Sequence, residues 1–253
     1  MYSVLYVDDE PALLDIGKIY LEKSGRFRVD VAASVEEAII KLKTCTFDAI
    51  VSDYQMADTD GIQFLRFIRD LYRDIPFILF TGRGREEVVI EALNSGADFY
   101  LQKGGEPKSQ FAELDYKIRT ALDRRKVQTE LKDSQKQLSD LINFLPDATY
   151  AIDMKGHVIV WNRMMEELTG IPPASAIGKE NIPSTLPLYQ KSGHALADCI
   201  VRAEEEPEKS YPNLRRSGDR LTAETFSPAR SNEKGGYFWL TASPLYDSAG
   251  KVV

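Results

Sequence analysis

The chain has 253 residues, of which 43% are hydrophobic and 28% are charged, a balance typical of a soluble globular protein with one large or two ordinary domains. Its net charge of −7 argues against binding nucleic acid through its own surface, which needs clustered Lys and Arg. No apolar run approaches the roughly 20 residues of a membrane span, and the N-terminus lacks the basic region of a signal peptide.

The first half of the chain alternates between strand and helix patterns. Helical spacing predicts a helix after each strand, one of them capped by Ser34, and a long helix from Lys108. Continuous apolar strands are typical of a parallel sheet buried on both faces, and strict alternation implies right-handed crossovers and a doubly wound sheet. The short apolar runs predict strands near residues 4–7, 27–31, 47–51, 76–80 and 98–101.

Polar side chains follow four of these strands. Asp8 and Asp9 come after the first strand, Asp53 after the third, Thr81 after the fourth and Lys103 after the fifth. Because ligands of such sheets bind at the carboxyl ends of the strands, we expect these groups to converge. Three carboxylates repel one another unless a cation joins them, and Mg²⁺ prefers such oxygen ligands. The pattern predicts a magnesium site that holds a phosphoryl group beside an ammonium and a hydroxyl.

In kind and order, these residues resemble the response-regulator receiver domain over roughly residues 1–122. The resemblance implies a flavodoxin-like α/β fold whose five-stranded parallel sheet has the order 2-1-3-4-5. It also implies that Asp53 accepts a phosphoryl group from the phosphohistidine of a partner kinase. Such a domain assists its own phosphotransfer and autodephosphorylation and is otherwise not an enzyme.

The family pattern also implies roles for the neighbouring residues. Asp9 and Asp53 would bind Mg²⁺ directly, together with the backbone carbonyl of Gln55, and Asp8 would bind it through water. The remaining residues implied are Lys103 as the phosphate contact, Thr81 as the switch hydroxyl and Tyr100 as the switch aromatic.

Two positions depart from the family pattern. Gly104 follows Lys103 where the family usually has a cis proline, and a cis bond without proline is costly although Gly eases the sterics, so both a cis and a trans bond remain open there. Ala57 replaces a common proline in the loop after the acceptor. Neither change removes a group that carries the chemistry.

Residues 123–145 are predicted to form a connecting helix. From Lys108 to about Leu145 the chain contains neither Pro nor Gly. Two interpretations remain open: an amphipathic helix packed on one domain, or a parallel dimeric coiled coil that conveys the receiver's state and makes a homodimer. The second interpretation depends on a stripe with spacings of four and three, formed by Val127, Leu131, Ser134, Leu138, Leu141 and Leu145.

Residues 146–253 resemble a PAS domain. Leu145-Pro146-Asp147-Ala148, Trp161-Asn162, Glu167-Leu168-Thr169-Gly170 and Ile177-Gly178 carry the resemblance. It implies an α+β fold with an antiparallel five-stranded sheet, with later strands near 220–227 and 236–245. The turn at Gly250 enters a last strand where the chain stops, so we expect the domain to be incomplete at its C-terminus and an output or kinase module to be missing.

The sequence predicts no haem or flavin in this second domain. Cys45 and Cys199 lack the context of a flavin-reactive cysteine and any metal-type spacing, so we expect reduced, at least half-buried thiols of a cytosolic protein. His194, in a helical stretch, is the only candidate haem ligand. A small-molecule ligand and a ligand-free interaction module both remain open.

Three functional readings compete for the whole chain. The first is a cytoplasmic, prokaryotic signalling protein that is phosphorylated in trans, because no kinase core accompanies His157 or His194. The second is a doubly wound hydrolase or nucleotide-binding enzyme, but no glycine-rich phosphate loop follows the first strand. A transcription regulator is the third, and no helix-turn-helix or basic patch supports it. The cognate kinase, the PAS signal and the output are not identified by the sequence.

Overall fold

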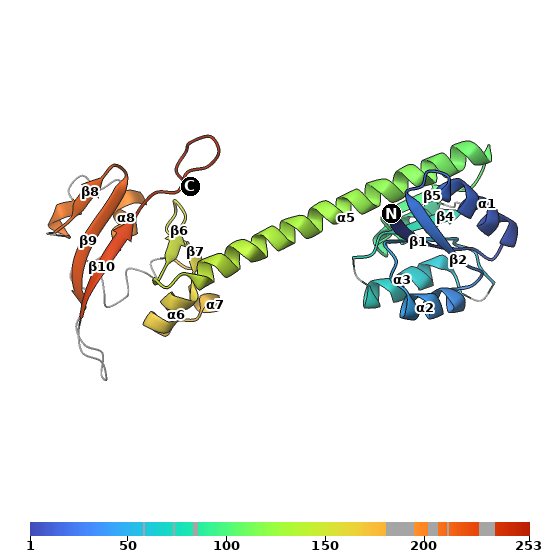
Figure 1. Ribbon diagram of the computed structural model, residues 1–253. Helices are drawn as coiled ribbons and strands as arrows, with labels where there is room; N and C mark the ends of the chain where they lie inside the picture. The colour runs from blue at the N-terminus through green and yellow to red at the C-terminus, as the bar shows by residue number, and fades with distance from the viewer. Residues whose placement is uncertain are drawn as a thin grey trace. The chain divides into compact units, whose positions relative to one another are not determined.

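A computed structural model describes residues 1–57, 59–72, 74–82, 86–180, 195–201, 207–211, 213–227 and 236–253. It divides the chain into two compact units, Met1–Ser134 and Gln135–Val253. Each unit has its own elements, which Figure 1 labels, and each is described by itself.

The first unit is built on a parallel sheet of five strands in the order β2-β1-β3-β4-β5, which confirms the predicted topology. The strands are β1 (Tyr2–Val7), β2 (Phe27–Ala32), β3 (Ala49–Ser52), β4 (Phe77–Thr81) and β5 (Phe99–Gln102). The helices between and after them are α1 (Pro11–Glu22), α2 (Val35–Thr44), α3 (Gly61–Leu71), α4 (Glu86–Asn94) and α5 (Pro107–Phe144).

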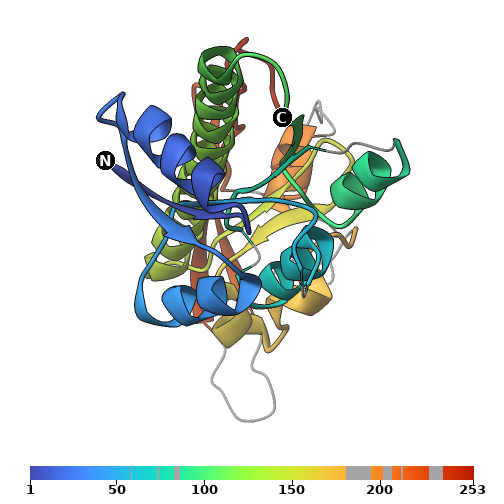
Figure 2. The same cartoon turned by 90° about the vertical axis from the view of Figure 1, so that its right-hand side faces the viewer.

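Helices cover both faces of this sheet, as the continuous apolar strands predict. One buried cluster joins the sheet to α2, α3 and α4 through residues such as Ala38, Ile68 and Ala92. The other joins the opposite face to α1 and α5 through residues such as Leu14 and Leu114. Figures 1 and 2 show α1 on the opposite side of the sheet from α2 and α3.

Side-chain caps fix the start of two helices. The Ser34 side chain accepts a hydrogen bond from the backbone N–H of Glu37, which confirms the predicted cap of α2. The Asp60 carboxylate accepts from the N–H groups of Ile62 and Gln63 at the start of α3. The α3 cap sets the course of the chain directly after the third strand.

In the first unit, the boundaries of the strands and helices differ from the predicted ones by at most two residues. The first strand begins at Tyr2, because its N–H donates to the Arg26 carbonyl and extends the pairing with β2. α5 begins at Pro107, one residue before the predicted start, and ends at Phe144. Within the described residues no peptide bond is cis, so the bond between Lys103 and Gly104 is trans.

The second unit holds antiparallel strands in two separate sheets. One sheet has the order β10-β9-β8 and the other pairs β6 with β7. Its strands are β6 (Tyr150–Ile152), β7 (Val158–Trp161), β8 (Arg215–Ser217), β9 (Arg220–Ser227) and β10 (Gly236–Ala242). Its helices are α6 (Arg163–Thr169), α7 (Pro173–Ala176), α8 (Leu196–Val201) and the 3₁₀ helix η3 (Pro207–Lys209).

The expectation of one five-stranded sheet in this unit was therefore wrong for the described residues. The predicted last strand forms only an isolated bridge, between Tyr246 and Val252, and does not connect the two sheets. β10 ends at Ala242 instead of residue 245, because Pro244 has no N–H to donate to a ladder.

The structure also tests the predicted burial of the two cysteines. Cys199 is buried on α8, as predicted, but Cys45 is exposed. Cys45 directly follows the last residue of α2, where the helix ends at the surface, so the prediction of a half-buried side chain was wrong for it. His194, the candidate haem ligand, lies outside the described residues.

Candidate functional site

Acidic side chains gather where β1 and β3 end. These strands pair in parallel with Val7 opposite Ser52, so Asp8 and Asp53 follow matched positions. The Asp53 N–H donates to the Val7 carbonyl at 2.8 Å and holds the two strand ends together. Asp8 is 0% exposed and Asp53 5%, whereas Asp9 is exposed to solvent. Two of the three predicted carboxylates are thus buried and one borders water.

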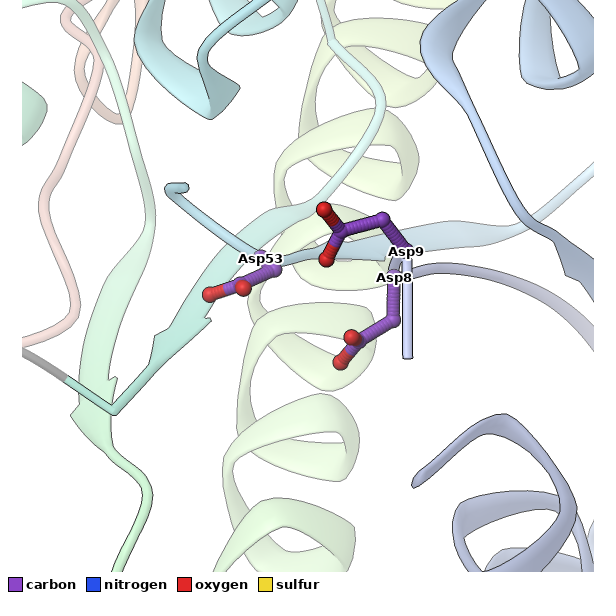
Figure 3. Close-up of side chains that lie close together, drawn as sticks. All are labelled: Asp8, Asp9 and Asp53. Carbon is purple, nitrogen blue, oxygen red and sulfur yellow. The ribbon is translucent and has the colours of Figure 1, made fainter. Parts of the chain in front are cut away.

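The three carboxylates lie close enough to share one cation. Asp8, Asp9 and Asp53 each offer one oxygen, and these oxygens all lie within 4.8 Å of one another. Figure 3 shows the three side chains at the ends of the two strands. An exclusively carboxylate set of this kind suits a hard divalent cation such as Mg²⁺ better than zinc or copper, which prefer nitrogen and sulfur. The residues present therefore fit the predicted metal.

Lys103 brings a positive charge to the buried pair. Its Nζ lies 2.6 Å from Oδ2 of Asp8 and 3.2 Å from Oδ2 of Asp53, and its side chain is 10% exposed. The backbone N–H of Lys103 donates to the Thr81 carbonyl at 2.6 Å, which fixes the chain after β5 against the end of β4. The ammonium therefore sits between the two buried carboxylates, as the strand-end pattern predicts.

Burial governs the acid–base behaviour of Asp53. Its pKa is raised above the ordinary value, chiefly because burial disfavours the charged form. The Lys103 ammonium opposes this shift and the Asp8 carboxylate adds to it. The Tyr54 N–H donates to Oδ1 of Asp53 at 2.7 Å and favours the ionised form. Lys103 and the Tyr54 N–H therefore only partly offset the cost of burying the negative charge of Asp53 at the end of β3.

The predicted switch residues lie on the neighbouring strands. Thr81 is the last residue of β4 and is 1% exposed, and Leu79 of that strand pairs with Tyr100 of β5. Tyr100 is half-buried and packs against the α2–α4 side of the core. Its pKa is raised, first by burial and then by the charge of Asp53. Gln55 is exposed in the loop after Asp53, and its role as a carbonyl ligand stays a prediction.

Three contacts of the site escaped sequence reasoning. The buried Tyr6 hydroxyl donates to Oδ2 of Asp8 at 3.0 Å, and burial together with Asp8 raises the Tyr6 pKa. The Ser52 hydroxyl donates to the Asp53 carbonyl at 2.9 Å. A Cβ at Gly61 would lie 2.2 Å from that carbonyl oxygen. A polar residue one or two places before an acid is only a weak sequence signal for such a contact, and the close approach of Gly61 has no signal in the sequence.

The second unit has a half-open groove and a surface cluster. The groove has a volume of about 1050 Å³ and is lined mainly by apolar residues of β6, α8 and β10, such as Tyr150, Leu196 and Phe238. On the surface, the two ring nitrogens of His157 lie 3.0 Å from Asp153 Oδ2 and 3.1 Å from Glu180 Oε1. Neither feature identifies a ligand.

No helix in the described part of the chain combines the length and apolarity that a membrane crossing needs.

Among curated proteins, the chain is 31% identical over 141 residues to response regulator Rre1 of Synechocystis sp. and 35% identical over 144 residues to transcriptional regulatory protein YvrH of Bacillus subtilis. These matches cover 55% and 57% of this chain and 59% of each relative, so the chain spans about three fifths of their length.

A solved structure, the CheY-like response regulator receiver domain protein of Methanospirillum hungatei JF-1, is 30% identical. The match covers 51% of this chain and 98% of that one, with a TM-score of 0.47.

Two protein-family models match the chain. The family described as the response regulator receiver domain matches residues 4–115, and the family described as the PAS fold matches residues 136–252. The chain therefore contains a response regulator receiver domain followed by a PAS domain.

Proposed function

We propose that this protein acts in two-component signal transduction and that its receiver domain accepts a phosphoryl group on Asp53 from a partner histidine kinase. In this proposal residues 1–122 are the receiver, residues 123–145 the connecting helix and residues 146–253 the PAS sensor or interaction domain. We place the protein in the cytoplasm of a prokaryotic cell. The observation that carries the proposal is the buried Asp53 carboxylate, which shares the Lys103 ammonium with Asp8.

The phosphoryl transfer uses Asp53 as a nucleophile. A carboxylate oxygen of Asp53 attacks the phosphorus of the kinase phosphohistidine, so a P–O bond forms as the P–N bond breaks. The electron pair of the broken bond stays on the ring nitrogen, and the ring, with its other nitrogen protonated, leaves as neutral imidazole. Lys103 already lies 3.2 Å from Asp53 and can attract the phosphoryl oxygens.

Asp8, Asp9 and Asp53, with the Gln55 carbonyl, would hold Mg²⁺. When bound, the cation neutralises charge on the carboxylates and on the phosphoryl oxygens. Water attack on the phosphorus of the acyl phosphate would later break the P–O bond to Asp53 and return the carboxylate and inorganic phosphate. The protein would in this sense assist its own phosphotransfer and dephosphorylation without turning over an external substrate.

Thr81 and Tyr100 would report the phosphorylated state. A hydroxyl at the end of β4 can donate to a phosphoryl group on Asp53, and a shift of Thr81 would open space for the half-buried ring of Tyr100. Such a change favours one of two packings of the β4–β5 edge. We propose that α5, which packs on the receiver core and continues to Phe144, conveys this change, and that the exposed stripe on α5 joins two copies as a homodimer.

Phosphorylation by a small donor tests the proposal directly. The full chain is incubated with acetyl phosphate, with and without Mg²⁺, and its intact mass is measured. Wild type and the surface variant Asp123→Asn should gain one phosphoryl group only with the metal, and Asp53→Asn should gain none. Equal labelling of wild type and Asp53→Asn would contradict the assignment, and turnover of a simple phosphoester would favour a hydrolase.

A further inference from the structure

The second half of α5 carries a row of exposed apolar side chains. Their spacing is four, then three, as in the seam of a coiled coil. Ser134, the polar member of the row, is exposed as well. The apolar members are Val127 (63% exposed), Leu131 (58%), Leu138 (59%), Leu141 (63%) and Leu145 (44%), the last directly after the helix end. Apolar groups at regular spacing on one helix face, left in water, indicate a missing partner.

This row does not continue the face of α5 that packs on the receiver. That face begins with Phe111, Leu114 and Ile118, which are at most 3% exposed. Val127 lies nine positions after Ile118 in the sequence, and at 3.6 residues per turn this is two and a half turns. Val127 therefore projects from the opposite side of the helix.

Polar contacts extend the receiver-facing side beyond its apolar part. Arg125 donates to the carbonyl of Asp48 at 3.3 Å, and Nζ of Lys132 lies 3.7 Å from a carboxylate oxygen of Asp74. Arg125 and Lys132 follow Ile118 by seven and fourteen positions, which are nearly two and four whole turns, so they lie on the same side of the helix as Ile118. The receiver thus uses one side of α5 up to Lys132 and leaves the row on the other side open.

The residues that flank the row suit a second copy of the same helix. With Leu131 and Leu138 at a positions, the flanking e and g positions from 128 to 142 hold one charge, on Glu130. In a parallel pair this carboxylate faces Gln135 of the second copy, so no like charges meet across the seam. The Lys and Asp residues of this stretch occupy outer positions, where they stay solvated.

We propose that residues 127–144 of α5 form a parallel, in-register, two-stranded coiled coil with a second copy of this chain. Parallel pairing places Ser134 opposite its own counterpart, so the polar residue weakens one layer of the seam instead of facing leucine in two layers. The inference deepens the homodimer in the proposed function and does not depend on phosphorylation of Asp53. It assigns the open side of α5 to a second copy.

Cysteine cross-linking tests both the contact and its direction. Ser134→Cys is introduced into a Cys45→Ser background, because Cys45 is the exposed native thiol and Cys199 is buried. Mild oxidation should convert most of this variant to a covalent dimer. Ser139→Cys, the same change on an exposed outer position of the helix, should stay largely uncross-linked. Equal cross-linking of the two variants would overturn the proposal.

The oligomeric mass provides a second and independent measurement. Wild type should show a mass of two chains of 28.5 kDa, about 57 kDa, by light scattering. Leu138→Asp should shift it to the monomer, and Ser139→Asp should leave it unchanged. Because Leu138 is exposed, its replacement does not disturb a core. A monomeric wild type, or a dimer that survives Leu138→Asp, would overturn the proposal, while acetyl-phosphate labelling of Asp53 would report separately on the phosphoacceptor role.

Discussion

At the scale of single residues, Asp53, the proposed phosphoacceptor, carries a cost to folding. Its carboxyl is 5% exposed and its pKa is raised, chiefly by burial. A carboxyl with a raised native pKa binds its proton more tightly in the folded state, so stability falls as pH rises from the unfolded pKa of about 3.9. Ionised Asp53 therefore destabilises the receiver at neutral pH.

Asp53→Asn should accordingly stabilise the receiver at pH 7 in metal-free buffer. We expect a gain of about 1 kcal/mol in the free energy of unfolding, a usual size for one substitution. The gain should shrink below pH 4, where Asp53 is protonated in both states, and on adding Mg²⁺. Urea unfolding at both pH values measures it, with Asp123→Asn as the surface control. A variant less stable than wild type at pH 7 would contradict this account of the charge.

Lys103 provides a second prediction at this scale. Its Nζ is 2.6 Å from Asp8 and 3.2 Å from Asp53, so Lys103→Met removes a cation from the place where phosphoryl charge would develop in the proposed transfer. The rate of labelling by acetyl phosphate should fall by about 10²-fold, the size of effect seen when one charge-stabilising donor is lost. Lys126→Met, on the exposed surface of α5, should label at the wild-type rate. An unchanged rate in Lys103→Met would exclude this role.

At the scale of elements, the approach of α3 to the end of β3 positions Asp53. The Gly61 N–H donates to the Tyr54 carbonyl at 2.8 Å, and the Asp60 side chain caps the helix. A Cβ at Gly61 would meet the backbone oxygen of Asp53 at 2.2 Å, and backbone cannot turn aside as a flexible side chain can. Glycine is therefore required here by proximity.

Gly61→Ala should destabilise the receiver by about 2 kcal/mol, within the range of overpacked sites. Gly82→Ala is the matched control for stability, because a Cβ there meets no atom of the described residues within 4 Å and the change affects the unfolded chain in the same way. Chemical denaturation of the two variants gives the comparison. Equal stability of the two would show that the β3–α3 turn relaxes without loss.

The elements also show what a sequence can and cannot predict. The convergence of Asp8, Asp53 and Lys103 was predictable, because parallel strands carry the residues that follow them to one edge. The Gly61 approach was not, because it depends on a distance between two backbones. The single five-stranded sheet expected in the PAS domain failed for a related reason: periodicity predicts strands but not which edges pair.

At the scale of the whole molecule, the chain divides into two units with separate buried cores. The proposed domains predict that the two cores unfold independently. Ile68→Ala should lower only the receiver transition and Leu221→Ala only the PAS transition, each by about 2–5 kcal/mol for a buried residue. Calorimetry of the full chain with both variants checks this. One cooperative transition that both variants shift would contradict the division.

The phosphoacceptor assignment is tested most directly by locating the phosphoryl group. After labelling with acetyl phosphate and Mg²⁺, borohydride reduces an aspartyl phosphate to homoserine, and peptide mass spectrometry then identifies the modified residue. We predict homoserine at position 53 and at no other acidic residue, with none in Asp53→Asn. A modified residue elsewhere, or an unmodified Asp53 in a chain that has gained phosphate, would contradict the account.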